Sequence, residues 1–431
     1  MALFGRTKPE PTPAPPAAES PASPTPEPVT AARSIRGVDE HRDVLLSAVT
    51  SLRPFGIGLL DAAGLTLCES IESDIDLPVY TAARSAGWAV RGSNLVGASP
   101  HHPVRLPVVG EIDAGGFRGA PLMPGTTVKV AQGAPVPEGA DAVVPVAEAR
   151  ELGDEVEFAA EAVFQQELVL AGSRISDGDL LLGNGSVLDA RAIGLLAEVG
   201  IDKVLARPKP RVVVASLGAD LVDPGLPLER LHQRYDSGTP LLAASARADG
   251  AQVFPIGILS SDPTRLRRTL TDQLLRADLL LLSADVTPGL VEVLSGLGTV
   301  DDAGVSVVPQ GPSLFAMIGE ERIPVVVLPR EAAAAYVGYQ VFVRPVVRKL
   351  AGTAPADREM VTAPLARPVT SDPEATSFLL GRTGDGGVEP LAGFDGSSAA
   401  ELVAADCLIV VDPGMGELDA GAEVTCWPLR G

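Results

Sequence analysis

The sequence predicts a multidomain α/β protein whose centre is a three-layer domain, a parallel sheet with helices on both faces. The main observation is an alternation of apolar runs and helical stretches of roughly 10–16 residues over residues 208–352. The expected strands are RVVVASLG, QVFPIGIL, DLLLLSA, GVSVVPQG and PVVVLPR, and the block ends in a long closing helix, AAAAYVGYQVFVRPVVRKLAG. Such continuous apolar runs are typical of strands that are buried on both faces. Short alternating runs cut by Gly and Pro occur before and after this block, and they predict two smaller β-rich parts.

The rest of the chain divides by composition. Residues 1–35 are rich in Pro, Ala, Ser and Glu, and because they have little apolar surface to bury we expect a disordered tail. Segments 36–76 and 164–207 contain the helical patterns VLLSAVTSL and AIGLLAEVG and predict one discontinuous linker domain. Residues 77–163 predict a β-rich insert domain, and residues 353–431 predict a small C-terminal β-barrel domain.

Charge and composition exclude several functions. The net charge is −21, from 55 acidic and 34 basic residues, which argues against nucleic acid as a partner. No apolar run approaches the roughly 18 residues of a membrane span, so we expect no direct membrane insertion. Cys68, Cys407 and Cys426 lack the spacing of a metal site, which indicates reduced thiols and a cytoplasmic protein.

Five segments follow one another in an order that resembles the molybdopterin molybdenumtransferases (MoeA) and the E domain of gephyrin. They are QGAPVPEGADAVVPVAE (132–148), RAIGLLAEVGIDKV (191–204), PRVVVASLGADLVDPGLPL (210–228), FVRPVVRKLAG (342–352) and DCLIVVDPG near the C-terminus. The resemblance implies an elongated homodimer with a shared active cleft, a dimerisation role for the linker domain and a molybdopterin-binding central domain. It also implies molybdate insertion into adenylylated molybdopterin with Mg²⁺, which needs carboxylates for the cation and cations or amides for the oxyanions.

The resemblance also assigns catalytic positions to residues of this chain. Asp236 and Ser237 match a family Asp-Ser-Asn motif, with Gly238 in place of the Asn. Ser283 and Asp285 lie in the segment that matches a glycine-rich family stretch. Asp236, Ser237, Ser283 and Asp285 are therefore the expected remnants of the catalytic site.

Cofactor and metal positions follow in the same way. Ser216 and Gly218 match a family Ser-Thr-Gly-Asp-Glu-Leu motif, and Gly311 matches the Gly of Lys-Pro-Gly-Lys-Pro, so these three are the expected cofactor-binding residues. Glu148 and Asp220 are the expected metal ligands, since each lies near a family acid.

Plainer interpretations stand beside these assignments. The alternative for Glu148 is a solvated acid in a loop. The alternative for Asp236 is a helix N-cap, and that for Asp285 is a capping or surface acid. Arg330 and Glu331 are expected to pair with each other or to cap the closing helix.

The sequence departs from the family at five loops, all on the expected ligand side. Ala86 stands where the family has Asp, and Ala284 and Asp285 stand where bare glycine amides are expected to approach an oxyanion. The affected segments are 84–90, 216–221, 282–289, 309–313 and 329–332.

These losses favour one hypothesis and leave others open. Because one lost catalytic electrostatic contact costs about 2.7–4 kcal/mol, we expect lost or weak molybdenum insertion and a dimeric scaffold that binds a peptide of a membrane receptor or cytoskeletal protein. The alternative is an active molybdopterin molybdenumtransferase, and a third reading is a molybdopterin- or nucleotide-binding protein without turnover. Molybdopterin and Mg²⁺ are therefore expected by resemblance only, and a scaffold would need neither.

Overall fold

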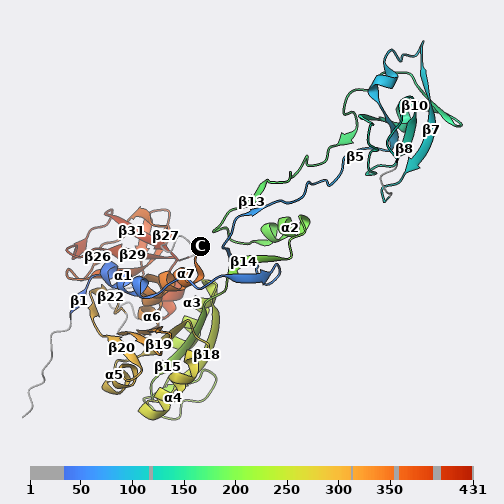
Figure 1. Cartoon of the computed structure of the whole chain (residues 1–431). Helices are drawn as coiled ribbons and strands as arrows, with labels where there is room; N and C mark the ends of the chain where they lie inside the picture. The colour runs from blue at the N-terminus through green and yellow to red at the C-terminus, as the bar shows by residue number, and fades with distance from the viewer. Residues whose placement is uncertain (1–33, 116–119, 312–313, 354–358, 392–398, 430–431) are drawn as a thin grey trace, which may run out of the picture.

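The computed structural model describes residues 34–115, 120–311, 314–353, 359–391 and 399–429. The molecule is elongated: two sheets form a large body at one end, a smaller β-rich unit lies at the other end, and a small sheet with helix α2 lies between them (Figure 1). The predicted tail falls outside the described residues except for its end. There Ile35 starts strand β1 (Ile35–Arg36), which pairs in parallel with β21 (Gly304–Val305), so a strand begins at the last residue of the predicted tail.

The central sheet has six strands and is mixed, whereas the sequence predicted a parallel sheet. Its order is β18 (Gln252–Leu259), β15 (Arg211–Leu217), β19 (Leu279–Ala284), β24 (Ile323–Leu328), β23 (Leu314–Ile318) and β20 (Gly298–Asp301). The first four strands are parallel, but β23 and β20 pair antiparallel with their neighbours. The cause is local: a short turn through Gly319, which has a positive φ, joins β23 to β24, and such a short connection permits only antiparallel pairing.

A second difference concerns the predicted strand GVSVVPQG (304–311). Its residues form β21 and β22 (Val307–Val308), but neither joins the central sheet. β22 instead pairs in parallel with β27 of the C-terminal sheet. The sequence correctly predicted a strand here but assigned it to the central sheet. A short apolar run does not determine which sheet edge a strand will join.

Helices cover both faces of the central sheet. Alternate residues of β15 enter different cores: Val212 and Val214 pack with helix α3, and Val213 and Ala215 pack with α4 and α5. The predicted long closing helix is divided, because a π-helical turn, Tyr339–Val343, separates α6 from α7. The helices of this body are α1 (Val38–Ala48), α3 (Gly238–Ala248), α4 (Pro263–Leu274), α5 (Pro288–Ser295), α6 (Ala332–Gly338) and α7 (Arg344–Ala351).

The C-terminal residues form a second sheet beside the body (Figure 1). Its strands are β22, β27 (Thr376–Gly384), β29 (Cys407–Val411), β31 (Glu423–Pro428) and β25 (Val361–Pro364), with β28 (Gly387–Pro390) paired to β27. A bridge between Leu365 and Val388 links the end of β25 to β28, so the sheet curls back on itself. Helix α8 (Ala399–Ala404) packs near β27, and β26 (Val369–Thr370) pairs with β30 (Glu417–Leu418).

The remote unit is built on a six-stranded sheet. Its order is β10 (Ala149–Leu152), β11 (Glu155–Phe158), β7 (Val104–Ile112), β8 (Thr127–Val130), β6 (Gly87–Val90) and β9 (Ala142–Pro145). Gly87 has no room for a side chain, since a Cβ there would lie 2.2 Å from the carbonyl oxygen of Val144. The backbone next to Ala86, the position where the resemblance leads us to expect an acid, is therefore closely packed.

Two extended segments connect this unit to the rest of the molecule (Figure 1). They run side by side, and the backbone N–H of Leu77 donates to the carbonyl of Ile175 at 2.7 Å. Next to them lie β4 (Ile71–Glu72) with β13 (Leu180–Leu182), β5 (Ala82–Ala83) with β12 (Leu168–Val169), the sheet of β2 (Phe55–Gly58), β14 (Lys203–Arg207) and β3 (Thr66–Leu67), and helix α2 (Ala190–Glu198). None of the helices in the described ranges is long and apolar enough to cross a membrane.

Candidate functional site

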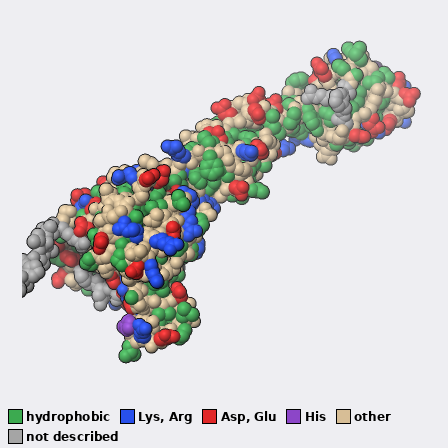
Figure 2. Space-filling view, turned by 60° about the horizontal axis from the view of Figure 1, so that its bottom comes forward, with side chains coloured by type: hydrophobic (Ala, Val, Ile, Leu, Met, Phe, Trp, Pro, Cys, Tyr) green, Lys and Arg blue, Asp and Glu red, His purple; other side chains and the backbone are tan. Residues whose placement is uncertain are grey.

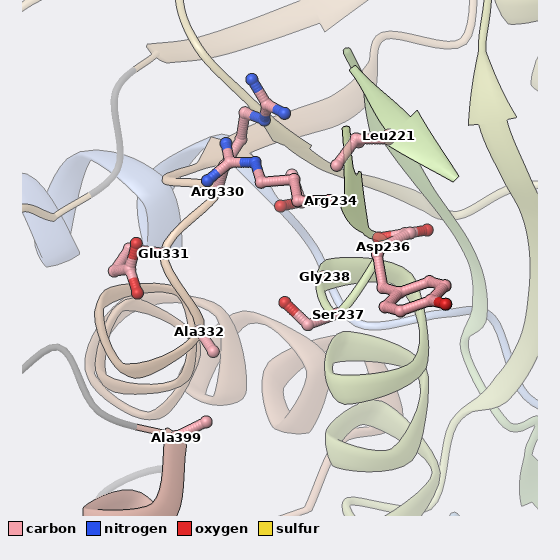
Figure 3. A pocket seen from close by; sticks show the side chains of 11 residues that line it. Leu221, Arg234, Asp236, Ser237, Gly238, Arg330, Glu331, Ala332 and Ala399 are labelled. Atoms are coloured by element: carbon pink, nitrogen blue, oxygen red, sulfur yellow. The ribbon is translucent and has the colours of Figure 1, made fainter. Parts of the chain in front are cut away.

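A cavity of about 270 Å³ lies at the edge of the central sheet where the parallel strands end. This edge is the usual ligand site of open α/β sheets, because the loops that follow the strands converge there. Figure 3 shows the cavity between the first turn of α3 and the segment that leads into α6. Its walls are formed by Leu221, Arg234, Tyr235, Asp236, Ser237, Gly238, Ser283, Arg330, Glu331, Ala332 and Ala399.

A buried polar network forms the floor of the cavity. The Ser216 hydroxyl donates to the Asp236 Oδ1 at 2.6 Å, and the Thr239 hydroxyl donates to the Ser216 Oγ at 3.0 Å. The Thr239 backbone N–H also donates to the Asp236 Oδ1, at 3.1 Å, so this carboxylate caps the first turn of α3. Asp236 is only 3% exposed. Asp236 therefore lines the cavity and also satisfies a backbone N–H at the helix N-terminus, while its expected catalytic role stays a prediction.

Close packing of the helix against the sheet shapes the same wall. A Cβ at Gly238 would lie 2.3 Å from the Ser283 Oγ, so this position of α3 accepts only glycine without a shift of its neighbours. The Ser283 hydroxyl donates to the carbonyl of Pro329 at 3.3 Å. The Ser237 side chain makes no capping hydrogen bond and points into the cavity (Figure 3).

Charged residues form the rim. The Arg330 Nη2 donates to both carboxylate oxygens of Asp220, at 2.6 and 2.7 Å, and its Nη1 donates to the Asp285 Oδ2 at 2.9 Å. The Arg234 Nε lies 3.2 Å from the second oxygen of Asp220. The hydrogen bond from Arg330, with a weaker contribution from Arg234, holds the pKa of the Asp220 carboxyl below its usual value. The expected pairing of Arg330 with Glu331 is wrong, since Arg330 turns to the acids of the two neighbouring strand ends.

Glycine is required beside this arginine as well. A Cβ at Gly218 would lie 2.8 Å from the Arg330 Nη2 and 3.0 Å from the Asp220 Oδ1. Gly218 therefore supports the geometry of the ion cluster by leaving space for the guanidinium group. The resemblance had named it as a cofactor-binding residue, which stays a prediction.

The structure brings most of the expected site residues together. Those at or next to the cavity are Ser216, Gly218, Asp220, Asp236, Ser237, Ser283 and Asp285. Gly311 lies elsewhere, where a Cβ would lie 2.5 Å from the Val307 side chain, so it serves packing. Glu148 lies in the remote unit, next to β9, and accepts a hydrogen bond from the Gln166 side chain at 3.1 Å.

Two arginines that the sequence analysis did not assign to the site line the cavity. Arg234 was not considered, and Arg330 was expected to pair with Glu331 or to cap the closing helix. Ser283 of β19 pairs with Leu328 of β24, and Asp285 and Arg330 each come two residues after these paired residues. That shared offset is the signal that would have placed both side chains at one edge of the sheet.

Comparisons with known proteins agree with the resemblance noted in the sequence. The family model for the MoeA N-terminal region (domain I and II) matches residues 36–200, and that for the MoeA C-terminal region (domain IV) matches residues 362–429. Molybdopterin molybdenumtransferase 1 of Mycobacterium tuberculosis (strain ATCC 25618 / H37Rv) is 31% identical over 419 residues, which cover 90% of this chain and 97% of the relative. The chain belongs to the MoeA family.

Further matches to MoeA proteins extend over the body that holds the cavity. Molybdopterin molybdenumtransferase 2 of the same strain is 33% identical over 346 residues, which cover 78% of this chain and 85% of the relative. A crystal structure of a molybdopterin biosynthesis MoeA protein from Pyrococcus horikoshii has a TM-score of 0.80 and 25% identity, and the match covers 92% of this chain and 100% of that chain. Apart from Ala399, the residues that line the cavity lie between the two regions matched by the family models.

Proposed function

We propose that this MoeA-family chain binds a molybdopterin ligand in the cavity at the sheet edge and acts as a molybdopterin molybdenumtransferase. The names of its relatives support this more than they support the hypothesis of lost activity, because two relatives that it matches over most of their length are called molybdopterin molybdenumtransferases. The observation that carries the proposal is the lining of the cavity, in which Arg234 and Arg330 share the walls with the hydroxyl-bearing residues Ser237 and Ser283.

This lining suits an oxyanion. Guanidinium groups bind phosphate and similar oxyanions through charge-assisted hydrogen bonds, which are about twice as strong as neutral ones. Ser237 also stands at the N-terminus of the eleven-residue helix α3, where the helix dipole favours negative charge. In the proposed complex the arginines hold the phosphate or molybdate, and Asp236 accepts a hydrogen bond from the ligand.

The test measures both binding and turnover. Purified full-length chain is given adenylylated molybdopterin, molybdate and Mg²⁺, and the release of nucleotide is followed. We expect release by the native chain and a loss of about 10–100-fold in the Arg234→Ala variant, which corresponds to one charge-assisted hydrogen bond. Arg268→Ala is the matched control, because it removes the same charge from an exposed position on α4. No release by the native chain refutes the proposal.

A second candidate function is the dimeric scaffold for a peptide of a membrane receptor or cytoskeletal protein. It is favoured by Ala86, which stands where the resemblance expects an acid. The scaffold hypothesis requires that the chain releases no nucleotide and retains a partner in a pull-down from a cell lysate. The pull-down is done with the full chain and with a chain that lacks residues 1–35. It also requires a homodimer by light scattering, so a monomer or an empty eluate argues against it.

A further inference from the structure

Arg330 connects the ends of three adjacent strands. Strands β15, β19 and β24 lie next to one another in the central sheet, and Asp220, Asp285 and Arg330 follow them in that order. The one guanidinium group contacts both acids, at 2.6–2.7 Å and at 2.9 Å. The Arg330 side chain is only 11% exposed, whereas Asp285 is 68% exposed, so the arginine is the buried centre of the cluster.

The residues at this edge do not fit the Mg²⁺ ion that the family resemblance implies. Magnesium requires oxygen ligands at about 2.0–2.1 Å in an octahedron, with free carboxylate oxygens directed toward it. Here both oxygens of Asp220 already accept hydrogen bonds from Arg330, and Arg234 approaches the same carboxylate. Among the residues that the structure describes, no three His, Cys, Asp or Glu side chains are grouped so that they could hold a metal ion.

The cluster also has the charge that a metal would otherwise supply. Two carboxylates close together repel each other unless a cation lies between them. The guanidinium of Arg330 occupies that position, and Gly218 leaves the space for it because a Cβ would lie 2.8 Å from the Arg330 Nη2. The Arg330 Nε is buried without a hydrogen-bond partner among the described residues.

We propose that Arg330 is a built-in cation that takes the place of a divalent metal at this edge of the cavity. Its positive charge, together with that of Arg234 beside Asp220, balances the two negative charges of Asp220 and Asp285. The cavity therefore binds an oxyanion such as phosphate without Mg²⁺. The inference concerns the same cavity as the proposed function and rests on it for the class of ligand, but the neutralisation of the two acids does not require turnover.

The first experiment measures the binding of Mn²⁺, a spectroscopic substitute for Mg²⁺, to the full-length chain by electron paramagnetic resonance. The native chain is expected to show no saturable site that depends on Asp220. Arg330→Gln removes the positive charge that lies between the two acids and leaves only Arg234 beside Asp220. This variant is expected to gain one Mn²⁺ site with an affinity at least about tenfold above that of the native chain. Arg330→Lys keeps the positive charge and is expected to behave as the native chain does.

Arg211→Gln is the matched control. Arg211 forms a comparable pair with Asp278, with contacts at 3.1 and 2.7 Å, but that pair has only one acid. Its loss changes the net charge by the same amount and is expected to add no Mn²⁺ site. If Arg211→Gln gains the same site, the effect is a general one of charge and the inference is wrong.

The second experiment measures the binding of inorganic phosphate by calorimetry, in EDTA and in excess Mg²⁺. The native chain is expected to bind phosphate with the same affinity in EDTA and in Mg²⁺. Arg330→Gln is expected to lose about 10–100-fold in phosphate affinity in EDTA and to recover part of that affinity in Mg²⁺. A native Mn²⁺ site that Asp220→Asn abolishes, or native phosphate binding that requires Mg²⁺, overturns the inference even if Arg330→Gln fails to fold. Absence of nucleotide release refutes only the proposed function.

Discussion

The environment of His41 predicts that the body of the molecule loses stability at mildly acidic pH. This side chain lies on helix α1, is 2% exposed, and packs edge-on against the ring of Phe342 at 5.4 Å between centroids. Neither ring nitrogen has a hydrogen-bond partner among the described residues. Burial, with a smaller contribution from the nearby charge of Arg36, lowers the pKa of His41 from 6.5 to about 4, although Asp301 acts in the opposite direction.

The sign and size of the effect follow from proton linkage. Between pH 6.5 and 4 the unfolded chain binds a proton at this imidazole and the folded chain does not, so the free energy of unfolding falls as the pH falls. One pKa unit is worth about 1.4 kcal/mol, so His41 alone removes about 2–3 kcal/mol of stability between pH 7 and pH 4.5. The stabilisation is complete above the unfolded pKa and is lost as the pH falls toward the folded pKa.

The measurement compares the native chain with His41→Phe in urea unfolding, followed by the fluorescence of Trp427, which lies in the partly buried layer around the core that holds Phe342. Phe keeps the ring but cannot bind a proton, so the pH dependence of the variant is expected to be weaker by about 2–3 kcal/mol. An NMR titration of the imidazole, assigned by its absence in the variant, gives the pKa directly. Equal losses of stability in both proteins, or a His41 pKa near 6.5, would refute the reasoning.

Two further predictions concern the packing of the central body. Gly238→Ala is expected to lower the free energy of unfolding by about 1–3 kcal/mol, because its Cβ would meet the Ser283 side chain. Gly289→Ala is the control and should have no such cost, since no atom lies within 4 Å of the new Cβ. Thermal unfolding compares the two variants, and equal melting temperatures would contradict the packing argument. Tyr339→Phe removes the hydrogen bond that the buried hydroxyl donates to Asp249 at 2.8 Å. Urea unfolding is expected to show that the free energy of unfolding falls by about 1–2 kcal/mol. An unchanged urea midpoint would show that this hydrogen bond contributes nothing to stability.

The local sequence pattern predicted most helices and strands of the central body. The apolar run at 279–284 and the stretch at 252–259 were both recognised as strands, and the structure has β19 and β18 there. Asp262 and Pro263 mark the start of α4, where the Asp262 carboxylate accepts from the Arg265 backbone N–H at 2.9 Å. Such signals lie within a few residues of the element that they start, so the sequence contains them in full.

The pairing of strands followed less well. β23 was not expected as a strand of the sheet, and the segment at 304–311 was given to the wrong sheet. Both errors have one cause: periodicity describes which face of a strand is buried, but the choice of neighbour depends on the length and path of the connections. The four-residue turn at 319–322 decided the direction of β23.

The candidate site shows the same division. Residues that match family motifs, such as Asp236 and Ser283, were found from the sequence and do line the cavity. Arg330 was assigned to the wrong neighbour, because Glu331 is next to it in the chain while its true partners are 110 and 45 residues away. Lys and Arg side chains also gather on one face of the large body in Figure 2, although the chain as a whole has a net charge of −21.

The sequence by itself determined the family, the elements of the central body and most of the side chains around the cavity, because these depend on motifs and on short-range apolar pattern. Only the tertiary structure decided that Asp220 and Asp285 share one guanidinium group. The reason is physical: a buried charge is stabilised by whichever opposite charge the fold brings within contact, and that distance in space is independent of the distance along the chain.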